Sequence, residues 1–140
     1  MKYKFFPHTA DTLFEAYGRT LEEVFENSAL AVESIMVNTD TLETIESYDI
    51  IIENENPEGL LYDFLSELIF IKDTDGLLFK KFDIRIHSRN KKLELIAICM
   101  GDKINPEKHE LIADAKAVTL HEFTLKKKKD IWMSRIIVDV

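Results

Sequence analysis

Three anionic groups lie near the two ends of this sequence. Asp11 closes the polar motif His8-Thr9-Ala10-Asp11, which follows an apolar opening, and Asp139 and Val140 are the last two residues. An α-carboxylate is ionised at neutral pH, so Val140 supplies an oxygen donor without using a side chain. If the first and last strands are neighbours, the three anions converge, and their repulsion is costly unless a cation neutralises it. We therefore predict that Asp11, Asp139 and Val140 bind a metal ion.

The donor atoms of this predicted site are all oxygens. Such a set suits Ca²⁺, Mg²⁺ or Mn²⁺ rather than zinc or copper. The alternative for Asp11 alone is an Asx-turn, because aspartate side chains in turns commonly bond to the nearby backbone. Asp139 follows the apolar run 136–138, so it either faces solvent by alternation or is a strand-end carboxylate that needs partners.

Histidine and lysine candidates have weaker support. A histidine without a second ligand at metal-binding spacing is more often a surface or capping residue, which applies to His8, His109 and His121. Strand alternation puts Lys116 on one face with Val118 and Leu120.

The alternative for Lys116 is a strand-start lysine whose aliphatic stem lies along the sheet. We retain His8, Lys116 and His121 only as residues that lie beside the site or contact a partner.

Composition predicts one domain over residues 1–140. The chain is 46% hydrophobic and long enough to bury one core. It contains no apolar run long enough to span a membrane and no signal peptide, so we expect no membrane contact and a cytoplasmic location. The single Cys99 excludes an intramolecular disulfide and leaves no cysteine pair for zinc, so we expect a small apolar residue in a strand.

The net charge of −8 argues against a broad nucleic-acid-binding face. Two basic islands nevertheless occur, at 89–92 and 126–129, where we predict hairpin turns. Solvated lysines that discourage edge-strand pairing are the simpler interpretation. The alternative is an electrostatic contact to an RNA-bearing partner.

Apolar periodicity predicts the elements that would position these residues. The two predicted helices are opened by the N-caps Thr20 and Asn56 and cover 21–36 and 57–72. The predicted strands cover 3–7, 13–18, part of 41–53, 82–87, 93–99, 117–125 and 131–140. The turn between the first two strands covers 8–12 and contains His8 and Asp11. This order predicts a two-layer α+β fold, with a mainly antiparallel sheet and two principal helices packed on one face.

The sequence resembles the archease family from end to end. The motifs that carry the resemblance are His8-Thr9-Ala10-Asp11, Thr20–Phe25, Leu60–Leu68, His109-Glu110, Lys116–Thr119 and Asp139-Val140. The chain departs from the family pattern at Thr12-Leu13, Asp102 and Leu120.

The resemblance implies an activator rather than an enzyme. Archeases promote guanylylation of an RtcB-type RNA ligase by GTP and its repeated turnover in tRNA splicing, and tRNA is contacted only through the ligase. The resemblance also implies that Asp11, Asp139 and Val140 bind a divalent cation, usually calcium, although magnesium or manganese would fit the same donors. The alternative is a stand-alone metal-dependent phosphohydrolase or cyclic phosphodiesterase with His8 as base, for which the sequence lacks further ligands.

Overall fold

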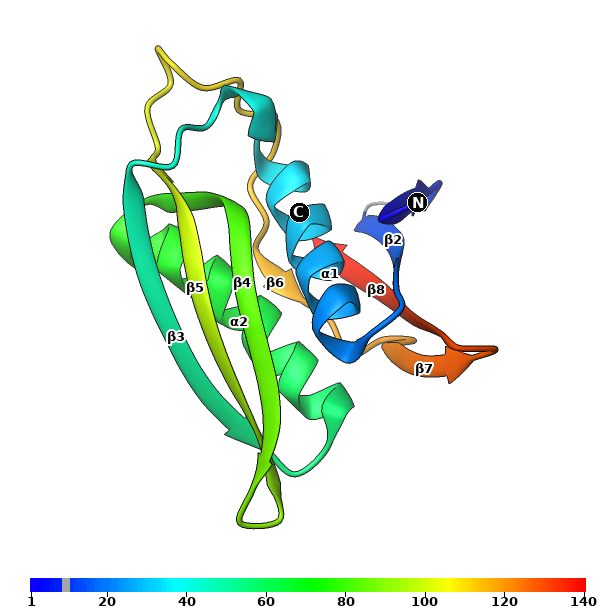
Figure 1. The fold of residues 1–140 in the computed structure, drawn as a ribbon. Helices are drawn as coiled ribbons and strands as arrows, with labels where there is room; N and C mark the ends of the chain where they lie inside the picture. Colours follow the sequence, from blue (N-terminus) through cyan, green and yellow to red (C-terminus); the bar gives the residue numbers. More distant parts are fainter. Residues whose placement is uncertain (9–10) are drawn as a thin grey trace.

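Two antiparallel sheets enclose two long helices in this computed structural model (Figure 1). It describes residues 1–8 and 11–140, so Thr9 and Ala10 of the first polar motif lie outside the described residues. The helices are α1 (Leu21–Met36), a short 3₁₀ helix (Thr39–Thr41) and α2 (Pro57–Asp75). The strands are β1 (Tyr3–Phe6), β2 (Asp11–Gly18), β3 (Glu46–Asn54), β4 (Leu77–Arg89), β5 (Lys92–Lys103), β6 (Ala117–Val118), β7 (Thr124–Lys128) and β8 (Ile131–Asp139).

Local capping chemistry sets the ends of both helices. The Thr20 hydroxyl accepts a hydrogen bond from the backbone N–H of Glu23 at 3.1 Å, which forms one half of the predicted capping box of α1, and the Glu23 carboxylate accepts from the N–H of Arg19 at 3.1 Å instead of that of Thr20. Asn56 caps α2 by accepting from the N–H of Gly59 at 2.7 Å. Gly76 ends α2 in the left-handed region, with φ 65°, a conformation that costs glycine little. Both predicted helix starts are confirmed.

The strands divide between two sheets. One has the order β1-β2-β8-β6, with β7 pairing the same edge of β8 as β6, and the other has the order β3-β5-β4. Helix α1 contacts β2 and β8 of the first sheet and β4 of the second, and α2 contacts strands of both. The predicted α+β class with mainly antiparallel strands is confirmed. The strands are divided between two sheets, with the helices between them. Period-2 alternation does not reveal this division, because it shows which face of a strand is buried but not which other strand it pairs with.

Several predicted segment boundaries were wrong: α2 ends at Asp75 instead of 72, β4 begins at Leu77 instead of 82, β5 ends at Lys103 instead of 99, and two further differences bear on the candidate site residues. Strand β2 begins at Asp11, because Asp11 and Thr12 pair with β8 instead of forming a turn. Strand β6 ends at Val118, and the predicted continuous strand 117–125 is interrupted by a loop in which Glu122 has φ 54°. Leu120 is consequently 68% exposed and does not share a buried face with Val118.

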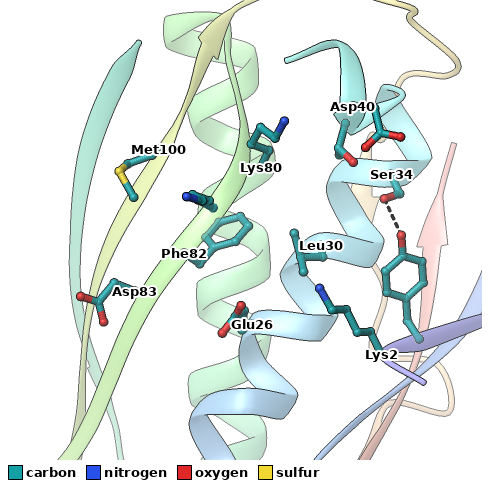
Figure 2. A pocket seen from close by; sticks show the side chains of 12 residues that line it. Lys2, Glu26, Leu30, Ser34, Asp40, Lys80, Phe82, Asp83 and Met100 are labelled. Atoms are coloured by element: carbon teal, nitrogen blue, oxygen red, sulfur yellow. Dashed lines mark hydrogen bonds between the residues drawn. The ribbon is translucent and has the colours of Figure 1, made fainter. Parts of the chain in front are cut away.

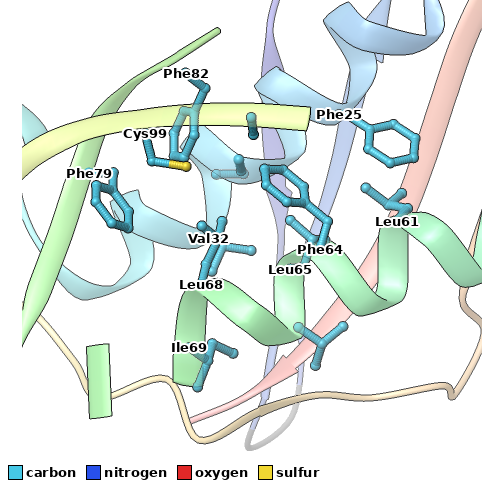
Figure 3. Packing of buried hydrophobic residues seen from close by; sticks show 14 of the residues in the cluster. Phe25, Val32, Leu61, Phe64, Leu65, Leu68, Ile69, Phe79, Phe82 and Cys99 are labelled. Atoms are coloured by element: carbon cyan, nitrogen blue, oxygen red, sulfur yellow. The ribbon is translucent and has the colours of Figure 1, made fainter. Parts of the chain in front are cut away.

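Aromatic side chains join the helices to the three-stranded sheet (Figure 3). Phe64 of α2 stacks on Phe25 of α1 with ring centroids 6.2 Å apart, and meets Phe82 of β4 edge-on at the same distance. Cys99 is buried in this core, so its predicted role as a small apolar residue is confirmed, and burial raises the pKa of its thiol to about 12. No helix of the described part of the chain is long and apolar enough to cross a membrane.

Candidate metal centre

Asp11 and Asp139 are direct cross-strand partners. Asp11 is the first residue of β2 and Asp139 the last residue of β8, and the antiparallel register places them opposite each other. The Cβ atoms of such pairs are about 4.5–5.5 Å apart, and a calcium ion is bound by oxygens at about 2.3–2.6 Å. One ion can therefore be shared by the two carboxylates. The structure brings these residues together, and their role as ligands stays a prediction.

The neighbours of the pair leave its charge uncompensated. Asp139 lies between Asp11 and Ala117, and its carbonyl oxygen accepts a hydrogen bond from the N–H of Lys116 at 2.7 Å. Neither Asp11 nor Asp139 forms an ion pair with any residue that the structure describes. Two facing carboxylates without a counter-charge are a suitable donor set for a hard cation.

The remaining ligands would have to be oxygens other than side-chain carboxylates. Over residues 1–8 and 11–140, no group of three or more His, Cys, Asp or Glu side chains is arranged to hold a metal ion. The predicted third ligand is the α-carboxylate of Val140, and backbone carbonyls or water would complete the set. The Val140 side chain packs against the hydrophobic core, which anchors the residue that follows β8.

The face of the five-stranded sheet that turns away from the helices carries the aspartate pair at one end. Two residues further along the strands, Leu13 and Ile137 face each other and are buried, although they lie outside the main core. The next pair is Glu15 with Arg135, whose side chains form an ion pair at 3.1 Å. Arg135 is thus already paired, and the apolar pair separates it from the aspartates.

The other predicted candidates lie on the surface. His8, Lys116 and His121 are all exposed. The hydrogen bonds and ion pairs of the described residues include none from the side chains of these three residues. Lys116 is linked to the aspartate pair by its backbone, and His121 lies in the turn after β6. The structure places none of the three in a position that assigns a chemical role.

His109 has a structural explanation. Its Nδ1 atom accepts a hydrogen bond from the N–H of Asn105, and its Nε2 atom lies 3.0 Å from the Asp102 carboxylate. Lys108 donates to the same carboxylate at 2.9 Å and is the main cause that lowers the pKa of Asp102 to about 2. This network fixes the loop after β5, and His109 itself is buried.

Glu33 is a buried carboxylate that sequence reasoning missed. It is fully buried in α1, where its Oε1 atom accepts a hydrogen bond from the N–H of Phe79 at 2.8 Å and its Oε2 atom has no partner among the described residues. Burial raises its pKa to about 8, against the smaller opposing effects of that hydrogen bond and of Lys72. A signal existed, since Glu33 lies four residues after Ala29 and three before Met36 on the apolar face of the helix.

A separate hollow lies between α1 and β4 (Figure 2). Its volume is about 490 Å³, and Tyr3 and Ser34 form a hydrogen bond of 2.9 Å at its side. Charged side chains of both signs line it: Lys2, Lys80, Lys81, Glu26, Asp40 and Asp83. Neither Asp11 nor Asp139 contributes, and the balanced charges favour no single class of ligand.

Comparison with known proteins gives one consistent result. The chain matches the Archease protein family (MTH1598/TM1083) over residues 3–140. It is 38% identical over 140 residues to protein archease of Pyrococcus abyssi, with 99% of each chain covered. It is 41% identical to protein archease of Methanothermobacter thermautotrophicus, with 99% of this chain and 98% of that protein covered.

Two solved structures have the same fold. The solution structure of Methanobacterium thermoautotrophicum protein 1598 matches with a TM-score of 0.89 and 41% identity, over 99% of this chain and 98% of that chain. A crystal structure of a Thermotoga maritima protein, described as an archease and possible chaperone, matches with a TM-score of 0.63 over 98% of this chain and 96% of that one. Its identity of 22% shows a shared fold alone.

Proposed function

Because this chain belongs to the archease family, we propose that it activates an RtcB-type RNA ligase through a divalent cation held by Asp11, Asp139 and the α-carboxylate of Val140. The observation that carries the proposal is the facing, uncompensated aspartate pair at the end of β2 and β8. Calcium is the proposed ion, and magnesium or manganese would suit the same oxygens.

The proposed mechanism is one of positioning. Nucleotidyl transfer depends chiefly on geometry and on neutralisation of phosphate charge, which a bound divalent cation supplies. Asp11 and Asp139 would hold the ion at an exposed end of the sheet, where it can face the active site of the ligase. The net charge of −8 complements a basic RNA-binding partner. On this proposal the chain promotes guanylylation of the ligase by GTP and performs no catalysis of its own.

A multiple-turnover ligation assay tests the function. Ligase is supplied at a small fraction of the RNA concentration, with GTP and two RNA fragments that carry a cyclic phosphate and a 5′-hydroxyl. We expect product to exceed the amount of ligase severalfold only when this chain is added. An unchanged yield would contradict activation. Release of phosphate, or opening of the cyclic phosphate, by the chain alone would instead support the hydrolase alternative.

A second prediction concerns Val140. A Gly-Ser extension converts the ionised α-carboxylate of Val140 into a neutral amide carbonyl, which is a weaker donor for a hard cation. We expect weaker calcium binding by isothermal titration and weaker ligase stimulation than with the unextended chain. A control with Gly-Ser added before Met1 should retain both. Equal calcium affinity of the unextended and C-terminally extended chains would remove Val140 from the proposed ligands.

A further inference from the structure

The two basic islands of the sequence have different electrostatic surroundings. In the β4–β5 hairpin, Arg89 pairs with Glu94 at 3.1 Å, and Lys92 lies 4.0 Å from Glu53. In the β7–β8 hairpin, none of the four lysines 126–129 forms an ion pair with a residue that the structure describes. All four are exposed. Between these two hairpins, the second is therefore the one whose lysines have no ion-pair partner among residues 1–8 and 11–140, although Asp130 lies next to them in its turn.

This lysine hairpin joins β7 to β8, and the ribbon that the two strands form extends past the sheet only near its turn (Figure 1), because β2 pairs with the other side of β8 as far as Trp132. Strand β7 pairs with β8 from Thr124 opposite Arg135 to Lys128 opposite Ile131. Lys129 and Asp130 form the two-residue turn, with φ of 52° and 66°, as expected for a type I′ hairpin. The ribbon is therefore built by ordinary β-pairing, which fixes the direction of each lysine.

Strand alternation distributes the lysines over both faces of the ribbon. Lys126 pairs with Met133 and Lys128 with Ile131 on the outer face, whereas Lys127 pairs with Trp132 on the other face. The two outer lysines lie about 6.6–6.8 Å apart along the strand, from the rise per residue. Two cations at this spacing on one face can contact neighbouring negative charges of a ligand that carries several of them.

Edge protection alone does not require such a cluster. β7 is an edge strand, and a single lysine is a common means of discouraging edge-to-edge pairing. Lys126 and Lys128 share one face of β7 and repel each other, a cost that a single protecting lysine would avoid, so the cluster is better explained by an anionic ligand than by protection. We infer that the lysine hairpin itself binds the phosphodiester backbone of a nucleic acid strand, in contrast to the expectation from the family resemblance that tRNA is contacted only through the ligase.

The surroundings of the hairpin favour a nucleic acid over a membrane. Trp132, the aromatic side chain that could insert into a lipid interface, packs against the hydrophobic core. Lys4, whose Nζ atom lies 5.0 Å from the ring centre of Phe6, adds one cation to the same side of the sheet, whereas Arg135 is neutralised by Glu15 at 3.1 Å. Binding by such a surface would be electrostatic and independent of base sequence.

Fluorescence anisotropy with the chain alone tests the inference. The probes are end-labelled 20-nucleotide RNA and DNA strands of the same sequence, titrated at several salt concentrations. For the unchanged chain we expect weak binding, with a dissociation constant of about 10⁻⁴–10⁻⁶ M, that weakens steeply with salt. A plot of log affinity against log salt has a negative slope. In the double variant Lys126→Gln, Lys128→Gln, this slope should become less steep by about 0.7 for each phosphate that the hairpin no longer neutralises.

The β4–β5 hairpin supplies the matched control. The variant Lys91→Gln, Lys92→Gln removes the same charge from a hairpin of the same type and should leave the affinity and the salt slope nearly unchanged. An equal loss of affinity in both double variants would reduce the effect to net charge and overturn the inference. The absence of nucleic acid binding at low salt would also overturn the inference. Binding of poly-glutamate as tight as that of the RNA strand would overturn it too, because it would indicate an acidic protein partner. Thermal melts of both variants check that they fold. Because the binding assay contains no ligase, its outcome does not depend on whether the chain activates a ligase.

Discussion

Replacing Asp11 or Asp139 by asparagine is expected to weaken calcium affinity by at least about tenfold and to abolish stimulation of the ligase. A factor of about 10–100 is typical even for residues that only support metal ligands, so loss of a direct ligand should cost at least as much. Asparagine keeps the shape of the side chain but removes the charge that makes the carboxylate a strong ligand. Because both residues lie at strand ends and outside the core, the fold should survive.

Melting temperatures measured with and without calcium distinguish loss of the metal site from a folding defect. Without calcium, either variant should melt at or above the temperature of the unchanged chain, because repulsion between the facing carboxylates is relieved. Added calcium should raise the melting temperature of the unchanged chain and have little effect on the variants, since a ligand stabilises only the state that binds it. Asp49→Asn, an exposed aspartate on β3, is the control and should behave like the unchanged chain. Full ligase stimulation by both site variants would contradict the proposed site.

The stability of the unchanged chain is expected to fall as the pH rises from about 4.5 to about 8, because of Glu33. Burial raises the pKa of this carboxyl from 4.5 to about 8. Between these values the folded state keeps a proton on Glu33 that the unfolded state has released, so increasing pH favours unfolding. The stabilisation is complete below about pH 4.5 and is lost as the pH approaches 8. Its size is on the order of a few kcal/mol, since one pKa unit corresponds to about 1.4 kcal/mol.

Urea unfolding at pH 5 and pH 8 measures this effect. Glu33→Gln keeps the size of the side chain and an oxygen that can accept from the N–H of Phe79, but it cannot ionise. The free energy of unfolding of this variant should therefore change less between the two pH values than that of the unchanged chain. The exposed Glu107→Gln is the control and should show the unchanged pH dependence. Equal pH dependence in Glu33→Gln and the unchanged chain would show that Glu33 does not contribute.

The features predicted correctly from the sequence are those that depend on short-range chemistry. Thr20 and Asn56 cap helices through bonds to residues three positions away, so the helix starts can be read from neighbouring letters. The strand status of Asp11 depends instead on Asp139, at the other end of the sequence. A local pattern could only suggest a turn there, and for that reason the predicted 8–12 turn wrongly included Asp11 and Thr12, which belong to β2.

The candidate site was accessible to sequence reasoning in part. Asp11 and Asp139 stood out because each carboxylate adjoins an apolar strand, but the division of the strands between two sheets depends on long-range pairing. Glu33 was missed because one acid on an amphipathic helix is ordinarily solvated, although its position on the apolar face indicated burial. The two basic islands could not be distinguished, since Glu53, which lies near Lys92, is far from the island in sequence, and nothing local shows that Glu94, two residues after the island, turns back to pair with Arg89.

The place of β8 in its sheet affects the order in which the protein can fold. This strand is the last in the sequence, yet it lies between β2 on one side and β6 and β7 on the other. Joining β2 to β8 closes a loop of nearly the whole chain, and such long-range contacts form slowly because closure costs conformational entropy. The β4–β5 hairpin needs only a two-residue turn. The aspartate pair is therefore expected to assemble late in folding, after the three-stranded sheet, so that a partly folded chain lacks the pair.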